Sequence, residues 1–270
     1  MPAVPSTPSR LAVIARLRAA GCVFAEEEAR LLFGTARTAA ELVDMVESRV
    51  DGRPLEHVLG WAEFCGLRIA VDPGVFVPRR RSELLVRQAV RLAGGSGSTI
   101  AGPESPLVVD LCCGSGAVGA AVLSRLGKGV LHAADIDAAA VSCARRNLPA
   151  GAHVHQGDLY DALPGVLRGR VDVLVVNAPY VPAGKIALLP AEARLHEPAV
   201  ALDGGADGLD VARRVVEGAA SWLAPGGSVL VETSDRQAPE LVAAFARTGL
   251  VPRVARSARL SATVVIAPRR

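Results

Sequence analysis

Aromatic residues are scarce in this sequence. Trp, Tyr and Phe make up 3% of the 270 residues, although 50% of the residues are hydrophobic. A core of this composition must be built mainly from Val, Leu and Ala. The chain is long enough for one large domain and one small domain, each with buried residues.

A strong excess of charge is also lacking. The formal net charge is only +3, which does not indicate nucleic acid as a required partner. Contact of the Arg-rich segments with RNA or with a ribosomal partner stays open. No apolar run reaches the ~18 residues that a membrane span needs, so we expect no membrane association.

The cysteines do not form a metal-binding pattern. Five are present, without the paired CxxC motifs of a zinc site. The simplest interpretation is a cytoplasmic protein with reduced thiols and no metal. Arg10, Arg16 and Arg18 interrupt the first apolar segment. This favours an amphipathic helix over a signal peptide, although the composition weakly resembles an organelle transit peptide.

Residues 1–53 are predicted to form a small helical domain that recognises the substrate. Apolar residues recur at helical spacing over 11–17 and 26–33. Thr38 and Glu41 have the spacing of a capping box at the start of a third helix. We expect this domain to pack against its neighbour, because it is small.

Residues 54–77 are predicted to form a β-hairpin connector, because residues 62–71 alternate between apolar and polar. The Arg triplet 79–81 follows and is either a solvated basic patch or an anchor for an acidic partner surface. Ser82 is the expected N-cap of the next helix. The Gly- and Ser-rich segment 94–105 is predicted to be a flexible loop.

Residues 78–270 are predicted to form the catalytic domain, an α/β fold with a parallel, doubly wound sheet. The predicted strands are 107–111, 130–134, 153–156, 171–176, 228–232, 251–256 and 263–267. The predicted helices are 117–126, 138–147, 208–223 and 236–248.

A glycine-rich turn follows the first of these strands. Gly114, Gly116 and Gly119 fit the G-x-G-x-x-G fingerprint, and Asp135 ends the next strand, where an acid binds ribose hydroxyls. This pattern fits both nicotinamide and S-adenosylmethionine enzymes. Asp110 favours the second, since a carboxylate suits an ammonium and a sulfonium and repels a pyrophosphate.

Three further features allow two interpretations each. Cys112 and Cys113 are either a redox pair or simply small residues that fit the turn. Asp158 either binds an adenine amino group or caps a short turn. The segment 177–180, Asn-Ala-Pro-Tyr, either forms a ligand site at the carboxyl end of a buried strand or only ends that strand.

Taken in order, these motifs resemble those of class I S-adenosylmethionine-dependent methyltransferases that act on planar nitrogens. More narrowly, the chain resembles the protein glutamine N5-methyltransferases that modify peptide-chain release factors. Three further segments carry the narrower resemblance: 54–66, 77–83 and the most specific one, 196–209. The resemblance implies a Rossmann-like sheet, a helical amino-terminal domain and a role in translation termination.

The resemblance also assigns roles to residues. It places the cofactor among Asp110, Cys112, Cys113, Gly114, Ser115, Gly116, Asp135, Asp158, Leu159 and Asn177. It places the substrate amide, and catalysis, at Asn177, Ala178, Pro179 and Tyr180. Asn177 Oδ1 and the carbonyl of Ala178 would accept the two N–H hydrogens of the amide, and Tyr180 would pack on its flat face.

The chain departs from the family pattern in three places. Ala178 replaces the first Pro of Asn-Pro-Pro-Tyr, Arg80 and Arg81 replace Pro and Glu, and the pattern near 259–263 is degraded. Three alternatives stay open. They are a methyltransferase for another nitrogen in a nucleic acid or small molecule, an NAD-dependent oxidoreductase, and a non-catalytic S-adenosylmethionine-binding protein. Loss of Asn177 would mark the last of these.

Overall fold

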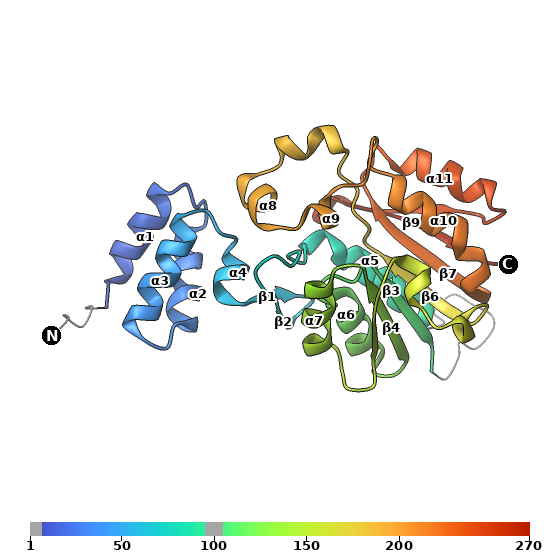
Figure 1. Ribbon diagram of the computed structural model, residues 1–270, viewed down its shortest axis with the longest axis horizontal. Coiled ribbons are helices and arrows are strands. Elements are labelled where there is room, and N and C mark those ends of the chain that lie inside the picture. Colours follow the sequence, from blue (N-terminus) through green and yellow to red (C-terminus); the bar gives the residue numbers. More distant parts are fainter. Residues whose placement is uncertain (1–6, 95–104) are drawn as a thin grey trace.

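The computed structural model describes residues 7–94 and 105–270. Apart from its two end residues, the loop predicted at 94–105 lies outside the described residues. A helical bundle stands at one end of the molecule and a β-sheet covered by helices at the other (Figure 1). Within the described ranges, none of the helices has the length and hydropathy to cross a bilayer.

The bundle consists of α1 (Arg10–Ala19), α2 (Ala25–Thr35) and α3 (Ala39–Val50), as predicted. Its core includes Val13, Leu17, Leu32 and Val46. The Thr38 hydroxyl accepts a hydrogen bond from the Glu41 N–H at 3.1 Å, which confirms the predicted cap. In a capping box the Glu side chain accepts from the N–H of the N-cap residue. Here Glu41 Oε2 accepts instead from the N–H of Arg37, the residue before the N-cap, at 2.7 Å.

The predicted hairpin is confirmed as β1 (Trp61–Phe64) paired antiparallel with β2 (Leu67–Ala70). The short helix α4 (Leu55–Leu59) precedes it and was not predicted. The 3₁₀ helix η1 (Arg80–Ser82) leads into α5 (Glu83–Ala93). Ser82 stands at the N-cap position of α5, but its side chain makes no capping hydrogen bond. The predicted capping role of Ser82 is therefore wrong.

The large sheet has the strand order β5-β4-β3-β6-β7-β9-β8. Its strands are β3 (Leu107–Leu111), β4 (Val130–Asp135), β5 (His153–Gln156), β6 (Val171–Val176), β7 (Leu223–Thr233), β8 (Arg253–Ser257) and β9 (Ala262–Pro268). Strand β9 runs antiparallel to β7 and β8, so the prediction of a fully parallel sheet is wrong at this edge. The β8–β9 connection is only a short 3₁₀ turn, η5 (Ala258–Leu260), and a parallel crossover needs a dozen residues or more.

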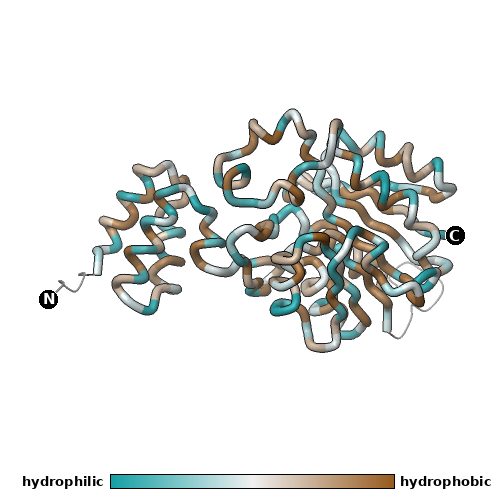
Figure 2. The backbone as a smooth tube through the Cα atoms, in the orientation of Figure 1, coloured by the Kyte–Doolittle hydropathy of each residue, from teal (hydrophilic) through white to brown (hydrophobic). Residues whose placement is uncertain are grey.

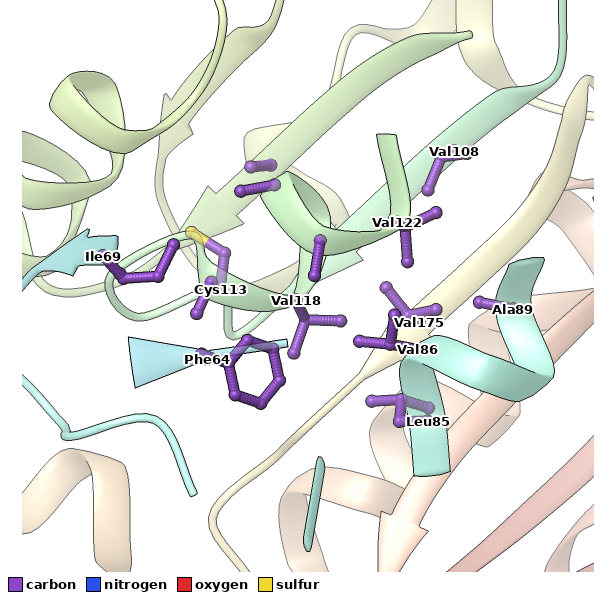
Figure 3. Packing of buried hydrophobic residues seen from close by; sticks show 14 of the residues in the cluster. Phe64, Ile69, Leu85, Val86, Ala89, Val108, Cys113, Val118, Val122 and Val175 are labelled. Atoms are coloured by element: carbon purple, nitrogen blue, oxygen red, sulfur yellow. The ribbon is translucent and has the colours of Figure 1, made fainter. Parts of the chain in front are cut away.

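Helices cover both faces of this sheet. On one face α5, α6 (Ala117–Leu126) and α7 (Ala138–Asn147) share a core with the hairpin. Figure 3 shows the hairpin residue Phe64 beside Cys113 and Val118 in this core. On the other face lie α10 (Asp210–Trp222) and α11 (Ala238–Arg247). Hydrophobic residues are concentrated in the strands between these helical layers (Figure 2).

Short helical turns make up the remaining connections. After β5 come η2 (Leu159–Ala162) and η3 (Gly165–Leu167), and after β6 come η4 (Ala183–Leu188), α8 (Ala191–His196) and α9 (Ala199–Leu202). Figure 1 shows that the segment with α8 and α9 projects from the sheet toward the bundle. Residues of this segment between 189 and 203 line a pocket.

Candidate active site

A pocket of about 610 Å³ lies at the carboxyl ends of the parallel strands, where open α/β sheets bind ligands. Its walls come from the glycine-rich turn, the segments around 76–82 and 177–181, and the segment 189–203. Of the predicted site residues, the following line it: Asp110, Cys112, Cys113, Gly114, Ser115, Asp135, Asp158, Leu159, Asn177, Ala178, Pro179 and Tyr180. The structure thus brings together residues from four separate motifs.

Gly116 is the predicted site residue that does not line this pocket. It is the N-cap residue of α6, with φ +76°, and a Cβ there would lie 3.2 Å from the side chains of Ala144 and Leu148. Its lack of a side chain therefore serves the turn and the packing of α6 on α7. Cys112 and Leu159 also have positive φ, 56° and 47°. Such values are costly for residues with a Cβ, and both residues line the pocket.

Asp110 is buried at the carboxyl end of β3, with 1% of its surface exposed. Its Oδ2 accepts a hydrogen bond from the N–H of Gly119 at 2.8 Å. Burial raises the pKa of this carboxyl to about 7, and the Gly119 bond only partly offsets that effect. A buried acid beside the turn suits a cationic ligand group, because a nearby positive charge would favour its ionised form.

Asp135 holds the turn as well as lining the pocket. Its Oδ2 accepts from the N–H of Gly114 at 2.8 Å, and its Oδ1 accepts from the N–H of Asp137 at 3.0 Å. Burial raises its pKa, and these backbone bonds lower it by a smaller amount. Each carboxylate oxygen has further lone pairs, so hydrogen bonds to ribose hydroxyls remain available to it.

Asp158 pairs with a residue that the sequence patterns did not single out. Arg214 Nη2 on α10 donates to Asp158 Oδ2 at 2.8 Å. Asp158 precedes η2 but makes no side-chain capping bond, so the capping interpretation of Asp158 is wrong. Arg214 also lines the pocket, as do Gly157 and Leu159 on either side of Asp158.

Cys112 and Cys113 are free thiols, as are the other cysteines. Burial raises the pKa of both thiols well above the usual value, which keeps them protonated and unreactive. These observations favour the interpretation that the two side chains are simply small enough for the turn. Within the described residues there is also no cluster of three or more His, Cys, Asp or Glu side chains that could hold a metal ion.

The segment 177–180 does more than end β6. Asn177 Nδ2 donates to Ser82 Oγ at 3.4 Å, which links it to the start of α5. The Tyr180 hydroxyl accepts from Arg81 Nη1 at 3.0 Å, and the Tyr180 carbonyl accepts from Gln237 Nε2 at 2.9 Å. The segment is thereby fixed from two sides, while all four of its residues face the pocket.

The Arg triplet does not act as a single solvated patch. Arg79 forms an ion pair with Glu197, whose side chain is fully buried. Glu197 also accepts from the N–H of Val77 at 3.3 Å. Arg79 and Arg81 line the pocket, whereas the Arg80 side chain is 75% exposed. Arg80 and Arg81 are both exposed, so these two fit the predicted solvated patch or partner anchor, whereas Arg79 is paired with Glu197.

Several residues that line the pocket were not among the predicted site residues. They include Ser82, Phe64, Phe76, Ile136, Pro190, Ala193 and Arg214. Two of them have a sequence feature that could have indicated a site. Phe64 and Phe76 are among only five Phe residues in the chain, and both belong to the segment that joins the bundle to the sheet.

Comparison with known proteins supplies the family. A protein-family model described as "Methyltransferase small domain" matches residues 98–205. The release factor glutamine methyltransferase of Geobacter sulfurreducens is 36% identical over 208 residues, which cover 76% of this chain and 69% of the relative. That of Streptomyces coelicolor is 36% identical over 224 residues, covering 79% and 78%. The chain belongs to the release factor glutamine methyltransferase family.

The protein is thus an enzyme of the methyltransferase class, and the family excludes the nicotinamide-dependent oxidoreductase alternative. A further relative is the 4-amino-L-phenylalanine/4-methylamino-L-phenylalanine methyltransferase of Streptomyces pristinaespiralis. It is 38% identical over 205 residues, covering 76% of this chain and 69% of the relative. Release factor glutamine methyltransferases and this enzyme are therefore similar to the chain to a comparable degree.

Solved structures agree on the fold. A methyltransferase from Pyrococcus furiosus superposes with a TM-score of 0.55 at 16% identity, covering 76% of this chain and 89% of the other. The 16S rRNA N2 G1207 methyltransferase of T. thermophilus gives 0.53 at 22% identity, covering 78% and 50%. Both confirm the predicted Rossmann-like methyltransferase sheet.

Proposed function

We propose that this methyltransferase transfers a methyl group from S-adenosylmethionine to the side-chain amide nitrogen (N5) of a glutamine in a peptide-chain release factor. The observation that carries the proposal is the convergence of Asn177, Ala178 and Tyr180 with Asp110 and Asp135 in one pocket. A release-factor substrate would place the activity in the cytoplasm, in translation termination.

The residues present fit S-adenosylmethionine. Asp110 offers a buried carboxyl for a cation, and the carboxylate of Asp135 can accept from ribose hydroxyls. Leu159 offers an apolar surface beside Gly157 and Asp158 for the adenine ring. When bound, this cofactor supplies an electrophilic methyl group on a positively charged sulfur.

The protein must make a poor nucleophile react. The lone pair of an amide nitrogen is delocalised, and no ordinary side-chain base can deprotonate it. Asn177 Oδ1 and the Ala178 carbonyl are two fixed acceptors at the carboxyl end of β6. By accepting both N–H hydrogens they would hold the nitrogen in line with the methyl group and favour the positive charge that develops on it. The proton then leaves after transfer, so no dedicated general base is required.

Tyr180 and Arg81 complete the substrate side of the pocket. Arg81 donates to the Tyr180 hydroxyl, which fixes the position of the outer end of the ring. A fixed ring can pack on the flat face of a planar amide and restrict its rotation. Burial raises the pKa of Tyr180, so the phenol stays neutral and does not act as a base.

We also propose that residues 1–53 help to recognise the protein substrate. Arg49 at the end of α3 bonds to Glu192 on α8 at 2.7 Å, so the bundle touches the segment that walls the pocket. Glu192 and Ala193 line the pocket beside this contact. A protein loop entering the pocket would therefore pass between the bundle and the sheet.

The test is incubation of the purified protein with methyl-labelled S-adenosylmethionine and purified release factors, followed by mass spectrometry. Label on a glutamine amide supports the proposal. Label only on 4-amino-L-phenylalanine or on RNA in parallel reactions would overturn the protein-glutamine assignment. Calorimetry gives a separate test of the cofactor: S-adenosylmethionine or its demethylated product should bind, and tight binding of NAD would contradict the proposal.

A further inference from the structure

Glu232 is a buried carboxyl that the proposed chemistry does not use. It lies near the end of β7 with 3% of its surface exposed. Its Oε2 has no hydrogen-bond partner among the described residues. Burial raises its pKa to about 7, and hydrogen bonding from the Ser82 side chain and the charge of Arg81 oppose that rise. A buried carboxyl with an unpartnered oxygen is costly and invites a functional explanation.

The register of the sheet places Glu232 beside Asn177. Val176 of β6 pairs with Val231 of β7, so Asn177 and Glu232 are the next residues on neighbouring strands. Side chains alternate between faces along a strand. Val175 and Leu230 pack in the core that contains α5, and Figure 3 shows Val175 beside Val86 of α5. Asn177 and Glu232 therefore point to the same face, at the beginning of α5.

Ser82 stands between these two side chains. It is 2% exposed, and its hydroxyl accepts from Asn177 Nδ2 at 3.4 Å. Its side chain also lies close enough to Glu232 to lower the pKa of that carboxyl. Its side chain makes no capping bond to the N–H groups of α5, so the hydroxyl is available to Asn177 and Glu232.

Hydrogen-bond direction then links Glu232 to Asn177. An ionised carboxylate only accepts, so in the interaction of Ser82 with Glu232 the Ser82 hydroxyl is the donor. Ser82 Oγ is left with acceptor lone pairs alone, and only the Nδ2 end of the Asn177 amide can satisfy them. The Oδ1 end of Asn177 is thereby turned away from Ser82 and toward the pocket.

We propose that Glu232 is a positioning residue that acts through Ser82 to fix the orientation of the Asn177 side-chain amide. The inference rests on the proposed function in one respect, namely that Asn177 Oδ1 accepts a hydrogen from the methylated nitrogen. A flipped Asn177 would present its NH₂ group to the N–H hydrogens of the substrate. Glu232 prevents this by fixing the direction of a chain of two hydrogen bonds.

The orientation should depend on pH. When Glu232 is protonated it can donate to Ser82, which frees the Ser82 hydrogen for Asn177 Oδ1 and permits the flipped state. The charged and titratable groups that act on this carboxyl are Arg81 from η1, which lowers its pKa, and Tyr180 after β6, which is neutral near pH 7. Turnover should therefore rise as the pH increases through about 7.

The test compares Glu232→Gln and Ser82→Ala with the parent enzyme at saturating cofactor. Each should lower kcat about 10–100-fold, less than the ~10²–10³ expected for loss of an oriented polar group itself. Cofactor affinity should stay unchanged, and Glu232→Gln should lose the pH dependence near 7. Glu217→Gln and Ser142→Ala, at exposed positions on α10 and α7, are matched controls that should retain parental kcat.

A double-mutant cycle separates positioning from structural support. In an Asn177→Ala background, Glu232→Gln should cause little further loss of kcat, because its target amide is gone. Full additivity of the two losses, or parental kcat in both Glu232→Gln and Ser82→Ala, would overturn the proposal.

Nuclear magnetic resonance of the Asn177 Nδ2H₂ group provides a readout that needs no methyl acceptor. Its signals should shift with pH near 7 in the parent and stay constant in Glu232→Gln. Absence of the shift in the parent would refute the link to Glu232. A shift without any glutamine methylation would instead mean that the proposed substrate is wrong.

Discussion

The backbone N–H of Gly119 donates to Asp110 Oδ2 at 2.8 Å, across the contact between α6 and β3. A Cβ at position 119 would lie 2.9 Å from Leu131 Cδ2 and 3.1 Å from that same carboxyl oxygen. The third glycine of the fingerprint therefore lets α6 approach the sheet closely enough to hold the buried acid. Its role is in packing and in placing Asp110.

Gly119→Ala should destabilise the fold by about 1–3 kcal/mol, because the added methyl overpacks a closed contact. Gly34→Ala is the matched control. Gly34 lies within α2 and a Cβ there meets nothing within 4 Å, so Ala should raise the free energy of unfolding by about 0.5–1 kcal/mol. Urea unfolding of both variants measures the difference. Equal effects of the two substitutions would refute the packing role.

Cofactor binding should depend on the ionisation of Asp110. In the ligand-free protein the pKa of this carboxyl is raised to about 7, so it is largely protonated at pH 6. A cation beside it favours the carboxylate, and S-adenosylmethionine affinity should therefore increase from pH 6 to pH 8 with release of a proton. Calorimetry in buffers of different ionisation enthalpy detects that proton. Asp110→Asn should remove both effects, and their persistence would show that another group titrates.

The same carboxyl affects stability with the opposite dependence on pH. Its pKa is higher in the folded chain, about 7, than the ~3.9 expected when unfolded. The folded state thus binds more protons between these values, and the contribution of Asp110 to the free energy of unfolding falls as the pH rises through that window. Unfolding of the ligand-free protein should be less pH-dependent between pH 5 and pH 8 in Asp110→Asn. An unchanged dependence would contradict the raised pKa.

Local patterns sufficed for the elements that build the site. Strands β3, β5 and β6 and helices α6 and α7 have the predicted bounds, because their apolar runs end at turn-forming or polar residues. Asp110, Asp135 and Asn177 could be assigned to one site because carboxyl ends of parallel strands share one edge of a sheet.

Contacts between distant segments could not be predicted in this way. The Arg79–Glu197 pair joins residues 118 positions apart, and no local pattern specifies such a partner. Ser82 has the residue type and position of a cap, and only the sheet register reveals that Asn177 and Glu232 both lie beside its hydroxyl. The direction of β9 likewise depends on how short the turn after β8 is.

Arg49 should be the main electrostatic link between the bundle and the pocket wall. Its Nε donates to Glu28 Oε2 at 2.7 Å, and its Nη1 lies 2.7 Å from Glu192 Oε1. Arg49→Met would leave the buried Glu28 charge unpaired and should cost about 3–5 kcal/mol. Glu192→Gln should cost only about 0–1 kcal/mol, because the Glu192 side chain is 46% exposed. Urea unfolding tests both, and a cost for Arg49→Met as small as that for Glu192→Gln would contradict the buried pairing.

The two halves of the proposed amide clamp can be tested separately. Asn177 acts through its side chain, so Asn177→Ala should lower turnover roughly 10²–10³-fold, as expected when one oriented polar group is lost from a transition-state site. Residue 178 acts through its carbonyl, which Ala and Pro supply equally. Ala178→Pro changes only φ freedom and one donor, so turnover should change less than about tenfold, below ~1.4 kcal/mol. Steady-state rates, with folding and cofactor affinity checked for each variant, provide the comparison. Near-parental turnover of Asn177→Ala would mean that Asn177 only ends β6 and that the amide is held elsewhere.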